Sequence, residues 1–215
     1  MPTISLRVSV PICSLRKPYA REFLETETVP PPSTVYGFLL SLVGEESRQR
    51  YIGTQLAIAV FQHPSVSQVL RTSWRTKSRE VGPGIGNNKI PNYQEVLTGL
   101  IFGVQLKQGE PLAERIQTIF AKDAGGSRFA HLKRYGGLSF GESRDLVDTV
   151  DYLPTDDGSC RWLTHNPEGV LALPVWVDHV GSKGTRWEQF ELHKGRWNDS
   201  LSEEHWMTIQ PRETL

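Results

Sequence analysis

The sequence predicts an α+β protein, made of a ferredoxin-like β-α-β-β-α-β domain with a protruding β-hairpin and a small β-rich C-terminal part. Three observations support this fold class. An alternating apolar segment near the N-terminus precedes an amphipathic helix, two β-prone segments flank a glycine-rich loop, and a second helix opens at Glu110-Pro111. The order of these segments is that of the ferredoxin-like fold.

The first strand and the first helix are separated by a long loop. Apolar and polar residues alternate from Ile4 to Val10, which is the period of a half-buried strand. The loop Pro11–Pro32 ends in three prolines, which hold an extended lead-in because proline cannot continue a helix or a central strand. A helix is then expected over about Thr34–Ser47, with Ser33 or Thr34 as its N-cap. The four free backbone amides and the positive dipole end at such a helix start suit a phosphate.

The middle of the chain predicts a long hairpin excursion over about Ser73–Gly99. The apolar segment Gln55–Phe61 is typical of a buried strand. Val66–Thr76 and Val96–Leu106 are typical of two further strands. Gly82–Asn88 lies between them and must be a loop, because its glycines and proline interrupt both helix and strand.

The second helix is expected from Glu110-Pro111 to Gly125-Gly126, because proline is favoured in the first turn of a helix. The remaining predicted strands are Leu138–Phe140 with Leu146–Tyr152, then Gly169–Val177 and Trp187–Leu192. We therefore divide the chain into two parts. Residues 1–152 form the ferredoxin-like domain, with the hairpin at about 75–95, and residues 153–215 form a β-rich extension.

Tryptophan is concentrated in the last third of the chain, where five of the six tryptophans fall at or beyond Trp162. Trp176 lies inside an apolar segment, so we expect it in the core. Trp197 and Trp206 lie among polar residues and are candidates for an interface, because tryptophan is enriched at interface hot spots. A small core that buries them is the alternative.

The charge pattern argues against a protein that coats nucleic acid alone. The formal net charge is +0, whereas nucleic-acid-binding domains are usually basic overall. The cations nevertheless gather in three stretches, which predicts basic loops on a balanced body. These stretches contain Arg7, Arg16, Lys17 and Arg21; Arg71, Arg75, Lys77, Arg79 and Lys89; and Arg128, His131, Lys133 and Arg134.

Several classes of function lack their sequence signals. The chain has no C-x-x-C, H-x-x-x-H or H-E-x-x-H spacing, no P-loop, no dinucleotide fingerprint and no G-x-S-x-G elbow, so no metal and no cofactor are expected. No apolar run approaches the ~20 residues of a membrane span. The N-terminus lacks the pattern of a secretory signal. The two distant cysteines, Cys13 and Cys160, indicate reduced thiols and a cytoplasmic setting.

Three motifs carry a resemblance to a known family. The first is Arg21-Glu22-Phe23, followed by Glu25-Thr26 and then by Pro30-Pro31-Pro32-Ser33-Thr34-Val35-Tyr36-Gly37. The second is the glycine-rich segment Gly136–Val147, with the sequence GGLSFGESRDLV, and the third is the basic segment Arg75–Pro91. In this order the motifs resemble the CRISPR-associated Cas-five family, whose members are RAMP-type subunits of type I Cascade effector complexes. The basic segment stands where that family has a protruding thumb.

The resemblance implies a non-catalytic subunit that binds and caps the 5′ handle of the crRNA, with a thumb that kinks the RNA between handle and spacer. It implies contacts with the backbone subunit of the Cas-seven type and the large PAM-reading subunit of the Cas-eight type, and it leaves open a contact with target DNA near the PAM. Cations suit phosphates, and aromatic or apolar side chains suit unstacked bases. The residues expected to bind RNA are Arg16, Lys17, Tyr19, Arg21, Ser33, Thr34, Arg75, Lys77, Arg79, Ile85, Lys89, Arg128, Lys133 and Arg134.

The main alternative is a metal-independent endoribonuclease that processes precursor crRNA, and an unrelated RNA-recognition-like interaction domain is the other. Cleavage needs a base, an acid and a cation, and Tyr36, His131 and Lys133 have the right chemistry. Members of the resembled family that cleave usually carry the lysine and histidine as neighbours, whereas here Leu132 separates them. Tyr36 also falls on the apolar face of its helix. We therefore expect that the protein is not an enzyme.

Overall fold

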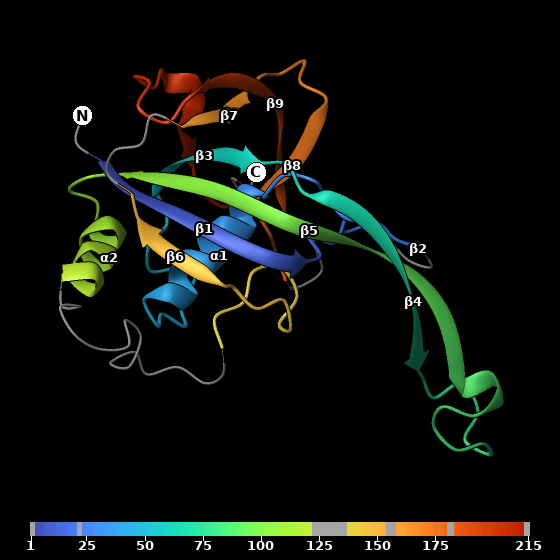
Figure 1. Cartoon of the computed structure of the whole chain (residues 1–215). Helices are drawn as coiled ribbons and strands as arrows, with labels where there is room; N and C mark the ends of the chain where they lie inside the picture. Colours follow the sequence, from blue (N-terminus) through green and yellow to red (C-terminus); the bar gives the residue numbers. More distant parts are fainter. Residues whose placement is uncertain (1–2, 21–22, 122–136, 154–157, 180–182, 213–215) are drawn as a thin grey trace.

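The structure, a computed structural model, describes residues 3–20, 23–121, 137–153, 158–179 and 183–212 (Figure 1). It is a mixed α/β structure with two helices, α1 (Pro32–Leu42) and α2 (Pro111–Ala121), and one mostly antiparallel sheet. The strands are β1 (Thr3–Cys13), β2 (Phe23–Leu24), β3 (Gln55–Gln62), β4 (Ser65–Trp74), β5 (Lys89–Lys107), β6 (Thr149–Tyr152), β7 (Ser159–His165), β8 (Leu171–Trp176), β9 (Arg186–Arg196) and β10 (Met207–Thr208). Short 3-10 turns occupy Gly86–Asn88 and Glu203–His205.

The strands follow the order β6-β1-β5-β3-β7-β9-β8, and each neighbouring pair along this path is antiparallel. The short strand β10 also pairs with β3, which brings the end of the described chain back to the middle of the sheet. The C-terminal strands therefore continue the sheet that the N-terminal strands begin.

Both helices pack on one face of the sheet and share its main core. Inward side chains of the central strands, such as Leu6 of β1 and Phe102 of β5, lie in one cluster with Leu39 of α1 and Ile116 of α2, and all four are fully buried. These positions alternate along the strands, as the sequence pattern predicted. Burial of each such side chain contributes about 1.5–3 kcal/mol to folding.

A tryptophan pair covers the opposite face of β3. The rings of Trp162 and Trp197 stack with centroids 5.1 Å apart and an interplanar angle of 5°. They lie over Ala57 and Ala59, and a Cβ on Gly103 would come within 2.5 Å of the Trp197 ring. Small residues on the strands thus make room for large indoles.

Trp197 is only 1% exposed, so its prediction as an interface residue is wrong. Its polar neighbours in sequence were misleading, because the indole turns onto the sheet and donates a 3.1 Å hydrogen bond from Nε1 to the Leu153 carbonyl oxygen. Trp206 is half-buried, with the Lys107 ammonium 5.0 Å from its ring centroid. Trp176 is buried, which confirms its assignment to the core.

The first helix starts earlier and ends sooner than the sequence predicted. It begins at Pro32, with Pro31 as N-cap and no side-chain cap, so the assignment of Ser33 or Thr34 as N-cap is wrong. Proline suits the first helical position because it lacks an N–H and its φ is already helical. The helix ends at Leu42, and Gly44 follows in the left-handed region at φ 66°.

Other boundaries differ more modestly. Strand β1 runs on to Cys13, and an isolated bridge joins Arg16 and Thr26, so the predicted Pro11–Pro32 loop contains paired structure. The segment predicted as strand from Leu146 is ordered as β6 only from Thr149 onward. The expected end of the second helix at Gly125-Gly126 lies outside the described residues. Strands β7 and β10 were not predicted.

The predicted hairpin is present and longer than expected. Strand β4 pairs with the first half of β5 from Ser65↔Thr98 to Trp74↔Lys89, and the two strands extend well beyond the body of the molecule (Figure 1).

Among the described residues, neither helix is long and apolar enough to span a membrane. Cys13 and Cys160 are buried free thiols, and burial raises the pKa of Cys13 to about 12.

Candidate nucleic-acid interface

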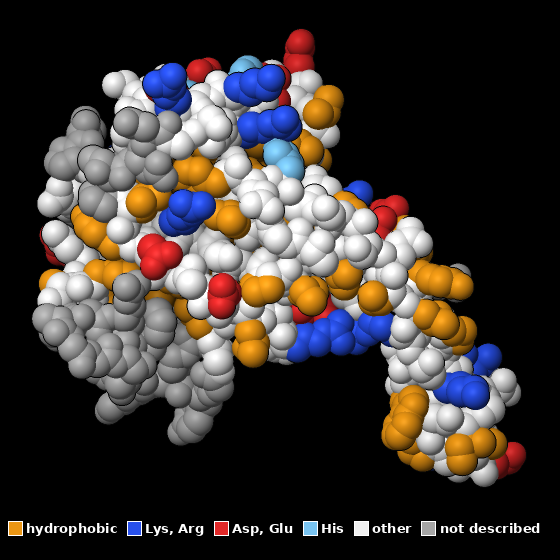
Figure 2. All heavy atoms as spheres, viewed as in Figure 1, with side chains coloured by type: hydrophobic (Ala, Val, Ile, Leu, Met, Phe, Trp, Pro, Cys, Tyr) orange, Lys and Arg blue, Asp and Glu red, His pale blue; other side chains and the backbone are white. Residues whose placement is uncertain are grey.

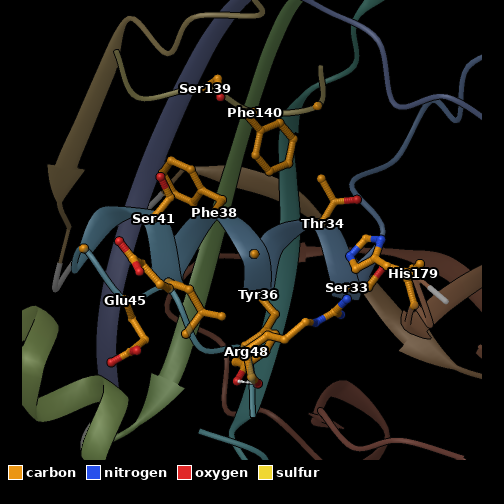
Figure 3. A pocket seen from close by; sticks show the side chains of 16 residues that line it. Ser33, Thr34, Tyr36, Phe38, Ser41, Glu45, Arg48, Ser139, Phe140 and His179 are labelled. Carbon is orange, nitrogen blue, oxygen red and sulfur yellow. Dashed lines mark hydrogen bonds between the residues drawn. The ribbon is translucent and has the colours of Figure 1, made fainter. Parts of the chain in front are cut away.

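A hollow of about 640 Å³ lies beside α1. The loop Ser139–Gly141 borders it on one side of the helix and Arg48 borders it on another (Figure 3). His179 stands beside the first turn, and Gly44–Glu46 lie at the far end. Elements distant in sequence thus converge on one helix.

Small side chains leave part of α1 accessible in this hollow. Thr34, Gly37 and Ser41 follow one another at spacings of three and four residues, so they share one side of the helix. Apart from its chain neighbours and the backbone of its own helix, no described atom lies within 4 Å of the position that a Cβ on Gly37 would occupy. The loop opposite is anchored by Phe140, whose ring packs edge-on against Phe38 at 5.7 Å. A ligand can therefore approach the helix closely without displacing the loop.

The first turn of α1 offers fewer free amides than the sequence suggested. The amides of Thr34 and Val35 donate to the Pro31 carbonyl oxygen at 2.9 and 3.0 Å, and the prolines have no N–H. Within the described residues, the Ser33 amide is the donor of this turn that remains. The expectation of four available amides is therefore wrong. Ser33 and Thr34 still line the hollow at the positive end of the helix dipole.

Arg48 supplies the guanidinium of the hollow. Its Cζ lies 4.3 Å from the centroid of the Trp176 ring, and its backbone carbonyl accepts a 2.7 Å hydrogen bond from the Tyr36 hydroxyl. These two contacts fix both ends of the residue. Burial raises the pKa of Tyr36 to about 12, so its hydroxyl stays protonated at neutral pH. Tyr36 has a packing role in this structure, as its place on the apolar face predicted.

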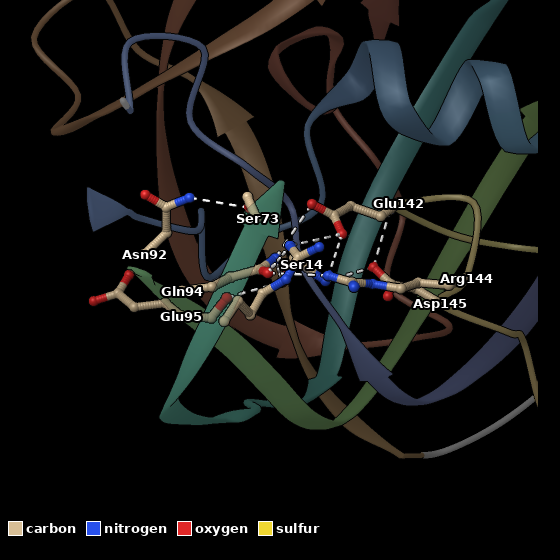
Figure 4. Close-up of polar contacts among 9 residues, drawn as sticks. Ser14, Ser73, Asn92, Gln94, Glu95, Glu142, Arg144 and Asp145 are labelled. Carbon is tan, nitrogen blue, oxygen red and sulfur yellow. Dashed lines mark hydrogen bonds and ion pairs between the residues drawn. The ribbon is translucent and has the colours of Figure 1, made fainter. Parts of the chain in front are cut away.

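Residues 137–147 of the glycine-rich motif contribute to a second polar cluster, which joins Ser14, directly after β1, to the base of the hairpin (Figure 4). Oδ2 of Asp145 accepts hydrogen bonds from the Ser14 amide at 2.8 Å and the Glu142 amide at 2.9 Å. Burial nevertheless raises the pKa of Asp145. Gly141 has φ 102°, and a Cβ there would lie 2.6 Å from the Ser14 carbonyl oxygen. Any other residue at this position would break the turn.

Gln94 of β5 is the centre of this cluster and is fully buried. Its Nε2 donates to Ser14 Oγ at 2.9 Å and to Glu142 Oε1 at 3.2 Å. Its Oε1 accepts hydrogen bonds from Arg144, at 3.0 Å, and from Arg71 of β4. We call Ser14, Gln94, Glu142, Arg144 and Asp145 the clasp. Because Arg71 and Gln94 belong to the hairpin, the clasp fixes the hairpin to the body.

The end of the hairpin carries the second predicted group of cations. Arg75, Lys77, Arg79 and Lys89 are all exposed, and no ion pair among the described residues engages them. Ile85 is 62% exposed at the tip. Basic and apolar side chains alternate on this part of the surface (Figure 2). The cations are therefore available to a ligand.

The first predicted group of cations lies elsewhere. Arg16 donates to the Ala20 carbonyl oxygen at 2.9 Å, and Lys17 lies 3.6 Å from a Glu25 carboxylate oxygen. Tyr19 is 82% exposed and stacks on Trp187 with centroids 6.0 Å apart. Lys17 and Tyr19 border a separate hollow of about 430 Å³ between the loop and β8–β9. The predicted residues thus fall into three places rather than one.

Some predicted residues cannot be placed, and some participants were missed. Arg21, Arg128, His131, Lys133 and Arg134 lie outside the described residues. Arg48, His179 and Trp74 were not proposed from the sequence. Trp74 lies near the end of the predicted strand Val66–Thr76 and directly before the basic segment, which is a signal that was available. Arg48 and His179 gave no such signal, because only the fold brings them to α1.

Comparisons with known proteins agree with the family resemblance of the three motifs. No family model matches the chain. It is 41% identical over 199 residues to "CRISPR-associated protein Cas5" of Myxococcus xanthus (strain DK1622), which covers 89% of this chain and 90% of that protein. One solved structure, "CRISPR RNA-guided surveillance complex", contains a chain that superposes with a TM-score of 0.62 at 14% identity and 90% coverage of each chain.

A second solved structure, "Crystal structure of Cas protein", gives a TM-score of 0.55 at 13% identity, covering 90% of this chain and 94% of that chain. At these identities the two structures establish a shared fold. The relative from Myxococcus matches along nearly the whole chain, including residues beyond the three motifs.

Proposed function

Because the chain belongs to the CRISPR-associated Cas5 family, we propose that it is a non-catalytic subunit of a type I Cascade-like RNA-guided complex that binds and caps the 5′ handle of the crRNA. The observation that carries this proposal is the combination of a hollow on the body and a basic hairpin fixed to the same body by the clasp. A strand of RNA needs both a place for its end and a surface along its backbone.

The hollow beside α1 suits the handle. The Ser33 amide, the Thr34 hydroxyl and the Arg48 guanidinium are donors for phosphate and sugar oxygens. Glu45 and Glu46 at the far end are acceptors, which suit the amino groups of bases rather than phosphates. Because donors and acceptors lie at different places in the hollow, the site should bind the RNA in one orientation.

The hairpin suits the next stretch of RNA. Its four exposed cations at the tip are suited to the phosphates of a flexible backbone, and Ile85 is a candidate wedge between bases. The guide, and not this chain, supplies sequence recognition of the target through base pairing.

The proposal extends to the fold and to the partners. A ferredoxin-like β-α-β-β-α-β core is supported by the strand order β6-β1-β5-β3 and by helices α1 and α2, which follow β1 and β5 in the chain. Backbone subunits of the Cas-seven type and a large subunit of the Cas-eight type are the partners that the family suggests, with a contact to target DNA near the PAM left open. The assembled complex is expected in the cytoplasm.

We also propose that the protein does not process its own guide. Tyr36 is buried, its hydroxyl donates to a backbone carbonyl, and burial raises its pKa to about 12, which is unsuited to a general base near pH 7. His131 and Lys133, the other members of the alternative catalytic set, are separated by Leu132 in the sequence. Processing is therefore assigned to another subunit.

Co-expression with the neighbouring subunits, followed by sequencing of the co-purified RNA, tests the function. We expect guides with a uniform repeat-derived 5′ end. Arg48→Ala should lower guide recovery, because it removes the guanidinium of the hollow.

Arg161→Ala is the matched control, because Arg161 is an exposed arginine of β7 that does not line the hollow. Equal guide recovery for both variants and the wild type would remove the hollow from the RNA path. Absence of any guide from the wild-type complex would contradict the function itself.

A further inference from the structure

The tip of the hairpin carries an indole that the predicted RNA contacts do not include. Trp74 is the last residue of β4, pairs directly with Lys89 across the hairpin, and is 72% exposed. Burial of a tryptophan normally stabilises a protein, so the stability of the fold does not explain why this large apolar ring is exposed. A ligand or partner that covers the ring would supply one.

One side of the indole is backed by a glycine. A Cβ on Gly84 would lie 2.5 Å from Cε2 and 2.7 Å from Nε1 of Trp74, so the ring rests directly against the Gly84 backbone. Gly84 also has φ 74°, which a residue with a side chain rarely adopts. The loop thus gives the ring a flat backing, and the remaining surface of the ring faces outward.

A buried asparagine fixes the loop that provides this backing. Asn88 is 1% exposed, although it lies in the most exposed part of the chain. Its Oδ1 accepts the amides of Lys77 and Ser78 at 2.7 and 2.9 Å. Its Nδ2 donates to the carbonyl oxygens of Ser78, Val81 and Gly82.

The Asn88 backbone adds two further contacts. Its carbonyl oxygen accepts hydrogen bonds from the amides of Arg75, at 2.9 Å, and Gly84, at 3.3 Å. These hydrogen bonds make the tip a preformed loop. A preformed site loses less conformational entropy on binding than a flexible loop does.

We propose that Trp74 is a stacking platform for one unpaired nucleobase of single-stranded RNA, held in place by Gly84 and by the Asn88-centred loop. This inference rests on the proposed function and adds a ligand class and a contact residue to it. The charges around the ring favour RNA. Arg75, Lys77 and Lys89 are exposed beside it, whereas lysine is depleted in the cores of protein–protein interfaces. Base stacking on an aromatic side chain tolerates any base, so the site selects an unpaired nucleotide rather than a sequence.

The test uses the complete complex assembled on synthetic guides in which 2-aminopurine replaces one base at a time across the handle and the first spacer positions. Stacking on an indole should quench the fluorescence of one position strongly. Trp74→Ala should abolish that quenching and weaken binding of the free guide by roughly 5- to 150-fold. Trp74→Phe, which keeps an aromatic face, should restore most of both.

A matched glycine pair separates the platform from general loop strain. Gly84→Ala places a methyl group in the indole and should reproduce the loss of quenching. Gly86→Ala adds the same methyl at another left-handed position, φ 50°, where the nearest atom is a Val81 methyl at 3.9 Å, and it should leave the quenching unchanged.

The outcomes separate this inference from the proposed function. If the wild-type complex holds its guide but no position shows quenching that depends on Trp74, the platform is wrong and the function stands. If Trp74→Ala instead blocks the entry of a neighbouring subunit and leaves the fluorescence unchanged, Trp74 is a protein-docking residue and the platform is again wrong. If the wild-type complex binds no guide, the proposed function is wrong, and the platform, which rests on it, is wrong as well.

Discussion

At the scale of single residues, side chains with catalytic chemistry serve mostly as structural support. Tyr36 has the hydroxyl that a cleaving enzyme would use, yet this hydroxyl holds the Arg48 backbone beside the hollow. Asp145 has a carboxylate in a basic neighbourhood, yet it accepts two amides and orders a turn. In both cases the side chain has a structural role, because it is hydrogen-bonded to the backbone.

Tyr36→Phe tests the first of these roles. The variant leaves the Arg48 carbonyl without its donor, so the free energy of unfolding should fall by about 1–2 kcal/mol. The 5′ end of the guide in the cell should not change, because we propose that another subunit processes the guide. Denaturant unfolding measures the first effect and RNA sequencing the second. Loss of a discrete cut in the repeat would instead assign Tyr36 to catalysis.

Asp145→Ala tests the second role. The variant leaves the buried Ser14 amide and the part-buried Glu142 amide without their acceptor, at a cost of about 1–3 kcal/mol for the buried amide. Asp148→Ala is the control, because Asp148 is exposed and lies only three residues away. Thermal unfolding of the wild type and both variants gives the comparison. Equal melting temperatures for both variants would show that the clasp does not stabilise the fold.

At the scale of elements, the hairpin depends on its ends. The clasp holds its base through Gln94, and Asn88 orders its tip. Between these points β4 has little contact with the body, since almost all its side chains are exposed. Besides the β4–β5 ladder itself, two small polar clusters therefore hold the hairpin at its base and its tip.

Asn88→Asp should disorder the tip and spare the body. The carboxylate keeps the acceptor for Lys77 and Ser78 but turns an oxygen toward the carbonyls that Nδ2 now contacts. Hydrogen exchange at residues 75–88 should rise, while the melting temperature of the body stays within about 2 °C. Asn87→Asp is the control, because Asn87 is exposed. Unchanged exchange in Asn88→Asp would mean that the loop does not need the Nδ2 contacts.

We expect the cations of the tip to set the salt dependence of RNA binding. Replacing Arg75, Lys77, Arg79 and Lys89 with alanine should reduce the slope of log K against log salt by about 0.7 for each phosphate that the hairpin then fails to neutralise. A quadruple variant at Arg161, Lys183, Lys194 and Arg196, which are exposed on β7, directly before β9 and on β9, removes the same net charge elsewhere. The same change of slope in both variants would show that RNA responds to total charge and not to the hairpin.

Sequence patterns predicted the elements whose structure depends on neighbouring residues. They did not predict features that depend on contacts between distant segments. Alternation indicated β1 and β3, and the glycine-rich loop indicated the hairpin. The start of α1 was misplaced because Pro32 was assigned to the lead-in, although proline also fits a first helical turn. Trp197 was misassigned because its partners, Ala57, Ala59 and Gly103, come from distant strands.

The site was predictable to the same extent. Ser33 and Thr34 were found from the proline-helix junction, and the basic tip from its composition. Arg48 and His179 were not predicted as lining residues of the hollow. Arg48 follows α1 by a few residues and His179 by more than a hundred, and nothing in the sequence of either loop indicates that it packs beside this helix. Their roles exist only in the folded chain.

At the scale of the whole molecule, the C-terminal strands and the N-terminal strands share one sheet and are held together by the Trp162–Trp197 stack. Trp197→Ala should lower the free energy of unfolding by about 3–5 kcal/mol, because it opens a cavity against β3. Trp206→Ala, at a half-buried ring, should cost less. Circular dichroism should show one transition in each protein. Two separate transitions would mean that the C-terminal strands fold independently.

The central claim is that one guide RNA runs from the hollow beside α1 to the hairpin tip. Photo-crosslinking measures this most directly: the complex is assembled on guides with 4-thiouridine at single handle positions, irradiated, digested and analysed by mass spectrometry. We predict cross-links from handle positions to peptides within residues 33–48, and from the handle–spacer junction to peptides within residues 74–89. Cross-links confined to the outer strands β7–β9, with neither of these segments labelled, would contradict the account.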